Sequence, residues 1–142
     1  MKKVILVMLA LCMGLMACNG GNVKKNELKS QKDVVEVLYF HGKQRCATCM
    51  AIEKETKTIV NGQFANSVKG GKLKFRVIDI TKAENETIAD KYEITWSSLV
   101  IVKYKDGKEQ AENLTKFAFA NARSKPDVFR SELTKKINEL LK

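Results

Sequence analysis

The stretch VVEVLYFHGKQRCATC, residues 34–49, sets the expectations for the rest of the chain. Residues 34–40 are almost all β-branched, aromatic or aliphatic, which predicts a strand buried on both faces. A polar loop then leads into CATCMAIEKETKTIV, residues 46–60, which is rich in helix formers and contains no glycine or proline. Cys46 and Cys49 are therefore expected at the point where a buried strand ends and a helix begins.

The pattern downstream predicts an α/β fold. The first three strands are joined by helices, which predicts right-handed crossovers and a sheet that starts parallel. Asp106-Gly107 is a hairpin signal, so the last strand should add an antiparallel edge. We expect a three-layer sandwich, with a central mixed sheet flanked by helices. The predicted strands are 34–40, 72–80, 98–104 and 108–114, and the predicted helices are 46–60 with a further turn or two at 63–68, then 83–92 and 124–142.

The N-terminus has the composition of a secretory signal. Lys2 and Lys3 precede an uncharged apolar run at residues 4–16, which is shorter than the roughly 20 residues that a membrane-spanning helix needs. The run ends in Leu15-Met16-Ala17-Cys18, which resembles a bacterial lipobox. This resemblance implies that Cys18 carries a lipid on its sulfur and becomes the first residue of the mature protein.

Three segments follow from this interpretation. Residues 1–17 are a lipoprotein signal peptide, residues 18–33 are a lipidated flexible tether of polar composition, and residues 34–142 are the folded domain. The protein is expected in a bacterial cell envelope, held by its lipid to the inner or the outer membrane and facing the periplasm.

The charge of the chain is basic but dispersed. Lys and Arg number 26 against 16 Asp and Glu, for a net charge of +10. The lysines are scattered, with no arginine-rich run and no regularly interleaved aromatic residues, so nucleic-acid binding is not expected. A basic surface of this kind predicts mild attraction to anionic lipid or to acidic protein partners.

The cysteine count favours a reactive pair over a structural one. Cys12 leaves with the signal and Cys18 carries the lipid, so Cys46 and Cys49 alone remain as thiols among the four cysteines. An exported protein meets an oxidising compartment, where structural disulfides are common. A disulfide that closes so small a ring constrains the unfolded chain little, which disfavours a purely structural role.

The expected position of the pair suggests its chemistry. Free backbone N–H groups and the helix dipole stabilise an anion at a helix start, so the thiol pKa of Cys46 should fall below its free value of about 8.5. Arg45 would add to this effect if it points at the sulfur. Cys49 lies one turn deeper on roughly the same helix face. This arrangement predicts that Cys46 attacks a partner disulfide and that Cys49 resolves the mixed disulfide.

The chain here resembles the thioredoxin superfamily over residues 34–142. The resemblance rests on RCATC after a strand, on KLKFRVIDI as the next strand, and on ADKYEITWSSLVIVKYKDGK, residues 89–108. It implies a thioredoxin-like fold and a thiol–disulfide oxidoreductase that acts on protein thiols and disulfides and needs no cofactor. We expect a monomer, with a substrate groove formed by Arg45, Ala47, Thr48, Trp96, Ser97 and Ser98.

The sequence departs from the family pattern at three points. The family's cis-proline is absent, because the single proline is Pro126 in the last helix, and Ser98 is the expected counterpart. The family's buried proton-accepting acid corresponds to Leu38, so Glu53, one turn after Cys49, is the candidate for a proton relay. Arg45 stands where the family usually has tryptophan.

Two other functions stay open at this point. A protein that binds or delivers Cu(I) or Zn would use Cys46, Cys49 and the single histidine, His41. Two thiolates suit Cu(I), whereas a closed zinc site needs four ligands. A non-catalytic tethered interaction module is the third alternative, although such a module has no need of two cysteines at this spacing.

Overall fold

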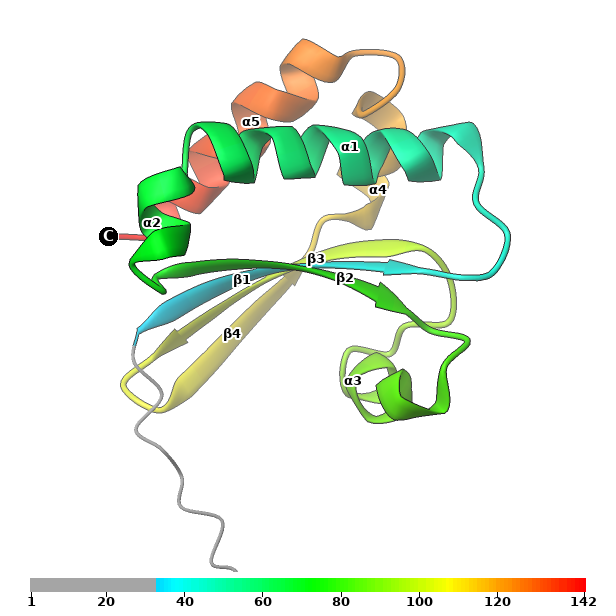
Figure 1. Cartoon of the computed structure of the whole chain (residues 1–142), viewed down its shortest axis with the longest axis horizontal. Coiled ribbons are helices and arrows are strands. Elements are labelled where there is room, and N and C mark those ends of the chain that lie inside the picture. The colour runs from blue at the N-terminus through cyan, green and yellow to red at the C-terminus, as the bar shows by residue number, and fades with distance from the viewer. Residues whose placement is uncertain (1–32) are drawn as a thin grey trace, which may run out of the picture.

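The computed structural model describes residues 33–142. The expected signal peptide, the lipid on Cys18 and the tether up to residue 32 therefore lie outside the described residues. The described strands and helices follow one another along the chain as predicted, and one short helix, α4, is added (Figure 1). The elements are β1 (Val34–His41), α1 (Ala47–Gly62), α2 (Ala65–Lys69), β2 (Leu73–Asp79), the 3-10 helix η1 (Ala83–Asn85), α3 (Glu86–Lys91), β3 (Ser98–Lys105), β4 (Lys108–Asn113), α4 (Thr115–Asn121) and α5 (Pro126–Leu140).

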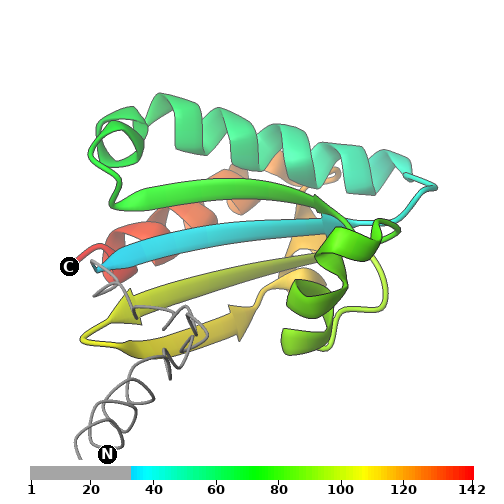
Figure 2. The ribbon, with the colours of Figure 1, turned by 60° about the horizontal axis from the view of Figure 1, so that its bottom comes forward.

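The strands form one mixed sheet in the order β2-β1-β3-β4 (Figure 2). β1 pairs with β2 in parallel, and β3 pairs antiparallel with both β1 and β4. Asp106 and Gly107 both have positive φ, as a tight hairpin between β3 and β4 requires. The predicted α/β class, the parallel start of the sheet and the antiparallel hairpin edge are confirmed. The expected crossover between the second and third strands is wrong, because β3 runs antiparallel to β1.

The third strand runs antiparallel to β1, because the β2–β3 connection stays at one end of the sheet. β2 ends at the same end of the sheet as β1, and β3 begins there, with Ser98 opposite Phe40. The six residues of α3 rise about 9 Å, whereas the eight residues of β1 extend about 25 Å. α3 alone therefore does not carry the chain back along the sheet, and β3 starts at the end where β1 and β2 stop.

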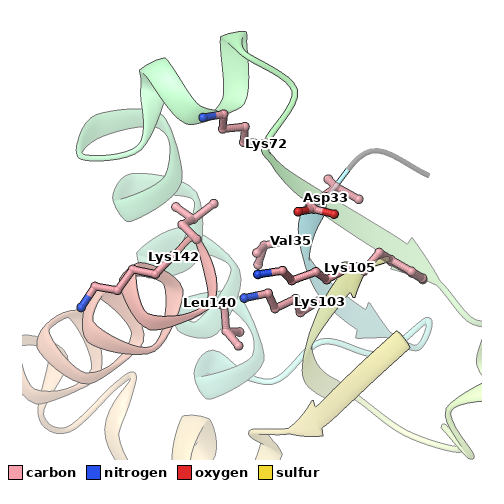
Figure 3. Close-up of a pocket in the computed structure, with 10 residues that line it drawn as sticks. Asp33, Val35, Lys72, Lys103, Lys105, Leu140 and Lys142 are labelled. Carbon is pink, nitrogen blue, oxygen red and sulfur yellow. The ribbon is translucent and has the colours of Figure 1, made fainter. Parts of the chain in front are cut away.

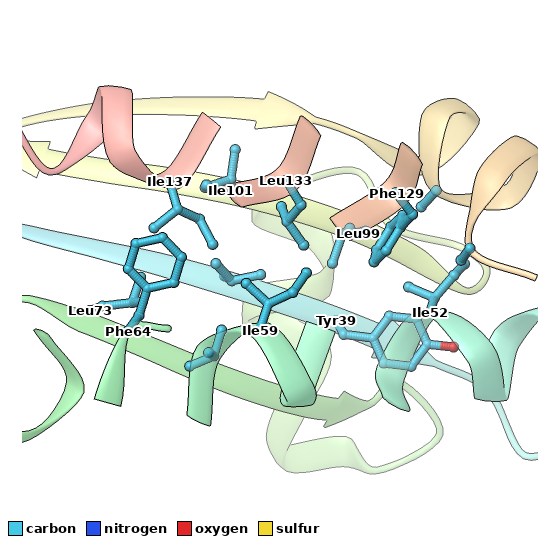
Figure 4. Close-up of a cluster of buried hydrophobic side chains, with 14 of the residues drawn as sticks. Tyr39, Ile52, Ile59, Phe64, Leu73, Leu99, Ile101, Phe129, Leu133 and Ile137 are labelled. Atoms are coloured by element: carbon cyan, nitrogen blue, oxygen red, sulfur yellow. The ribbon is translucent and has the colours of Figure 1, made fainter. Parts of the chain in front are cut away.

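Helices cover both faces of the sheet. α1 and α5 lie along one face with α2 and α4 at their ends, and α3 lies on the other face, as Figures 1 and 2 show. β1 is central, and its side chains alternate between two hydrophobic clusters. Val37 and Tyr39 belong to the larger cluster under α1 and α5 (Figure 4), whereas Leu38 and Phe40 belong to the smaller cluster beside α3. Among the described residues, the members of both clusters lie between Val35 and Leu141.

The C-terminal helix has the apolar stripe that the sequence predicts. Phe129, Leu133 and Ile137, four residues apart, are fully buried against the sheet. An ion pair between Glu55 of α1 and Arg130 of α5 joins the two long helices. This ion pair ties the middle of α1 to α5.

The sequence did not predict α4, which packs against β3 and α5. The Thr115 hydroxyl accepts a hydrogen bond from the Leu99 N–H of β3 at 3.1 Å, which ties the start of α4 to the sheet. The Phe117 ring stacks on the Phe129 ring of α5, with centroids 5.7 Å apart. Contacts with neighbouring elements therefore stabilise α4 as a helix. Among residues 33–142, no helix is both long enough and apolar enough to cross a membrane.

Shortening Phe129 should test how much the α5 stripe stabilises the fold. Phe129→Ala leaves a cavity in the larger cluster, and we expect it to lower the free energy of unfolding by about 3–5 kcal/mol. Val128→Ala is the matched control, because Val128 is 45% exposed on the same helix and should cost under about 0.5 kcal/mol. Urea unfolding followed by circular dichroism measures both values. Equal losses for the two variants would contradict the packing described here.

Candidate active site

A disulfide joins Cys46 and Cys49 at the start of α1, with the two Cα atoms 5.0 Å apart. β1 ends at His41, and a short loop brings the chain to Cys46, which is the N-cap residue of α1. The Cys46 sulfur accepts a hydrogen bond from the Cys49 backbone N–H at 3.0 Å. The pair therefore lies at a strand-to-helix junction, as predicted.

The two sulfur-bearing residues differ in exposure. Cys46 is exposed, whereas Cys49 is only 5% exposed. No acidic side chain lies in the first turn of α1, so the positive end of the helix is not offset there. A thiolate at Cys46 would receive the Cys49 N–H that the sulfur already accepts. The geometry therefore provides one accessible sulfur and one sheltered sulfur.

Tyr39 is the strand residue that contacts the sheltered cysteine. Its ring is fully buried, and its hydroxyl donates a hydrogen bond to the Cys49 carbonyl oxygen at 2.8 Å. Leu38, which the sequence analysis assigned to this place, lies in the cluster on the opposite face of the sheet. That assignment is wrong by one residue, because adjacent strand residues point to opposite faces.

Burial controls the ionisation of this tyrosine. Burial raises the pKa of Tyr39 above its ordinary value, because water no longer solvates the phenolate, and the opposing effects of Arg45 and Ser97 are smaller. The hydroxyl therefore remains a hydrogen-bond donor throughout the neutral range.

The Arg45 side chain contacts Glu53 and Tyr39. Its guanidinium forms an ion pair with Glu53, and its central carbon lies 5.7 Å from the centroid of the Tyr39 ring. The Nε atom of Arg45 is buried and has no hydrogen-bond partner among the described residues. Tyr39, Arg45 and Glu53 thus form one polar group against the first turns of α1, and Glu53 offsets the charge of Arg45 there.

The serine loop lies at the same end of the sheet. Ser97 and Ser98 are both buried, and Ser98 pairs with Phe40 near the end of β1. All peptide bonds in the described part of the chain are trans, so the bond between these serines is trans. The Ser98 hydroxyl donates to the Trp96 carbonyl at 3.0 Å. The loop that lacks the family's proline is therefore held by its own side chain.

Exposed apolar side chains flank the pair. Trp96 is 55% exposed and rests on Phe119 of α4, with ring centroids 5.2 Å apart. Met50, one turn after Cys46, is 54% exposed. Of the other predicted groove residues, Ala47 is exposed and Thr48 is half-buried, both in the first turn of α1. Sequence analysis missed Met50, although its spacing of four from Cys46 places it on the same helix face.

The ligands that a metal site would need are few. Within the part of the chain that the structure describes, no three His, Cys, Asp or Glu residues gather as a metal-binding group. The His41 Nδ1 lies 3.0 Å from the carbonyl oxygen of its neighbour Gly42. Cys46 and Cys49, once reduced, would supply two thiolates, and Cys18 lies outside the described residues.

Comparison with known proteins yields similarity of structure only. No protein-family model and no curated protein sequence matches the chain. A thioredoxin from Thermus thermophilus is similar with a TM-score of 0.47 and 14% identity, over 75% of this chain and 73% of that one. A structure described as thioredoxin-2, a component of malaria parasite protein secretion machinery, has a TM-score of 0.40 and 21% identity. The match covers 58% of this chain and 71% of that one. A third structure, described as a malarial protein, has a TM-score of 0.38 and 19% identity. The match covers 61% of this chain and 93% of that one.

The topology of this chain identifies its fold. A parallel β1–β2 pair, an antiparallel β3–β4 hairpin and helices on both faces surround a CxxC pair where the central strand passes into the next helix. The protein has a thioredoxin-like fold. The resemblance stated from the sequence is confirmed at the level of the fold and the place of the cysteine pair.

Replacing Tyr39 should reveal its tie to the cysteine helix. Tyr39→Phe removes the hydrogen bond to the Cys49 carbonyl, and at pH 7 we expect a loss of about 1 kcal/mol in the free energy of unfolding. A raised pKa in the folded state stabilises the fold fully below the unfolded value of about 10, and this contribution is lost as the pH rises through the folded value. The wild type should therefore lose stability more steeply than the variant above pH 10. Denaturant unfolding between pH 7 and pH 11 measures the stability of the wild type and of the variant. If the two stabilities fell in parallel above pH 10, the raised pKa assigned to Tyr39 would be refuted.

Proposed function

We propose that this protein is a thiol–disulfide oxidoreductase that acts on protein thiols and disulfides, with Cys46 as the attacking residue and Cys49 as the resolving one. The observation that carries the proposal is the disulfide between an exposed and a buried cysteine at the start of α1. A thioredoxin-like fold with a CxxC pair is typical of thiol redox chemistry. The fold alone does not define an activity, so the geometry of the cysteine pair supports the proposed one.

The reaction balances with the two cysteines alone. In the reduced protein, the Cys46 thiolate attacks one sulfur of a substrate disulfide, and the other substrate sulfur leaves as a thiolate. The Cys49 thiolate then attacks the Cys46 sulfur, which forms the intramolecular disulfide and releases the second substrate thiolate. Two electrons pass from the pair to the substrate. The reverse sequence oxidises a substrate dithiol, and the reduction potentials of the two partners set the direction.

The groups around the pair have separate roles in this scheme. The Cys49 N–H, which the Cys46 sulfur accepts in the disulfide, would stabilise the Cys46 thiolate before it attacks. Tyr39 is a positioning residue, because its hydroxyl holds the Cys49 backbone rather than the sulfur. Glu53 stays the candidate proton acceptor for Cys49, and its ion pair with Arg45 holds it at the first turns of α1.

The substrate surface is formed by exposed side chains beside Cys46. Met50 and Trp96 offer apolar contact area on α1 and on the serine loop. Arg45, Ala47 and Thr48 surround the cysteine, and the backbone of Ser97 and Ser98 lies at the same end of the sheet. A protein segment carrying a disulfide would lie across this surface, with Cys46 at its centre.

We also propose that the domain acts at a membrane surface. The basic start, the short apolar run and the Leu-Met-Ala-Cys sequence support lipid attachment at Cys18. The polar residues 19–33 would then form the tether, and the domain would face the periplasm of a bacterial cell envelope as a monomer. Mass spectrometry of the membrane fraction tests the lipid directly, because the mature chain would begin at an acylated Cys18.

Exchanging each cysteine separately tests the two roles. Cys46→Ser should abolish reduction of a protein disulfide, because the accessible sulfur is gone. Cys49→Ser should accumulate mixed disulfides with substrate, because the first step proceeds and the second does not. Non-reducing electrophoresis and a disulfide-reduction assay measure these outcomes, and a Cys46→Ser variant with intact reductase activity would show that the roles are assigned wrongly.

The same preparation separates redox chemistry from metal binding. A glutathione series should show reversible formation of the Cys46–Cys49 disulfide in the wild type. Elemental analysis of the reduced protein runs alongside it. Stoichiometric copper or zinc together with no reversible disulfide would overturn the proposal in favour of a metal-binding protein.

A further inference from the structure

Two lysines extend the buried face of β3 beyond the end of α5. Leu99 and Ile101 point into the larger hydrophobic cluster, and the two-residue period of a strand places Lys103 and Lys105 on the same face. α5 ends at Leu140, so the helix covers Leu99 and Ile101 but does not continue over the end of β3. Lys103 is half-buried and Lys105 is exposed.

A cavity of about 180 Å³ opens where the helix ends, and both lysines line it. Figure 3 shows the amines of Lys103 and Lys105 reaching from β3 into the same gap, while the amines of Lys72 and Lys142 point outward around it. Asp33 is the one acidic side chain in the lining of this cavity. None of the four lysines forms an ion pair with a carboxylate among residues 33–142.

Two ammonium groups that share a gap repel each other unless an anion lies between them. Their mutual repulsion and the partial burial of Lys103 both favour binding of a negatively charged group with several acceptor oxygens. Lys–phosphate contacts have this character, because a lysine offers a compact charge with three donors. The gap is therefore suited to a phosphate group.

The position of the cavity relates it to the membrane. Val34, where β1 begins, lines the cavity, so residues 1–32 join the domain at this end. β1 has eight residues and runs about 25 Å from here to the end that carries Cys46. A lipid on Cys18 would thus be joined to the domain at the lysine end rather than at the cysteine end.

We propose that Lys103 and Lys105 bind the phosphate groups of anionic lipids, so that the domain lies on the membrane with Cys46 turned away from it. This inference rests on the lipid anchor in the proposed function, but not on the redox chemistry. Anchored and docked in this way, the protein presents its cysteine pair to partners in the surrounding compartment.

Vesicle binding tests the docking surface on the chain 19–142, which keeps both hydrophobic clusters and lacks the lipid. Binding to phosphatidylcholine vesicles that contain phosphatidylglycerol should fall about fivefold for each lysine removed in Lys103→Gln and Lys105→Gln. The matched control is the double variant Lys54→Gln and Lys57→Gln, which loses the same charge from the exposed face of α1. If the double variant of Lys103 and Lys105 lost no more vesicle binding than the double variant of Lys54 and Lys57, the proposal would be overturned, because net charge alone would explain the attraction.

Two further measurements define the orientation and the source of the phosphate. Trp96, the single tryptophan, lies at the cysteine end, so its fluorescence should remain open to iodide quenching on vesicles; protection of Trp96 would contradict the orientation. Glycerol phosphate should not displace the bound protein at millimolar concentration, and displacement would indicate a site for a free phosphate instead. The Lys103 and Lys105 variants should reduce protein disulfides normally, so failure of docking is distinguishable from failure of the redox assignment.

Discussion

The structure of the site depends on how the first turns of α1 are held against the end of β1. Tyr39 donates a hydrogen bond to the Cys49 carbonyl, and Ile52, one turn further on, is fully buried against the sheet. β1 pairs with a neighbour on each side, so Tyr39 cannot shift without disturbing two ladders. The sheltered position of Cys49 and the exposed position of Cys46 both follow from this anchoring.

The polar environment of the pair differs from the one that the family resemblance implies. A neutral tyrosine lies under Cys49, and the nearby arginine is matched by Glu53. A tyrosine whose pKa is raised by burial cannot accept a proton from a thiol, so it acts by holding the backbone. Once reduced, a Cys46 thiolate would then be stabilised by the start of α1, with the Cys49 N–H as its donor.

The two proposed sites of the domain lie at opposite ends of the sheet. The strand ends near Cys46 gather the serine loop, Trp96 and the start of α1, whereas the opposite end gathers lysines where α5 stops. The central strand connects these ends directly, because it begins beside the lysine cavity and leads into the cysteine helix. Docking of the lysine end on a membrane would therefore turn the cysteine end away from it.

The sequence alone determined the strands, the hairpin and the place of the cysteine pair, because these depend on local patterns: apolar runs, an Asp-Gly turn and a helix start. The tertiary structure decided what such patterns do not carry. A strand buried on both faces has no polar alternation, so its sequence could not show that Tyr39 rather than Leu38 faces α1. Likewise, α4 alternates aromatic and small residues and becomes a helix because Phe117 packs on Phe129 and Phe119 on Trp96. Both outcomes depend on partners far away in the chain, and only the folded arrangement brings those partners into contact.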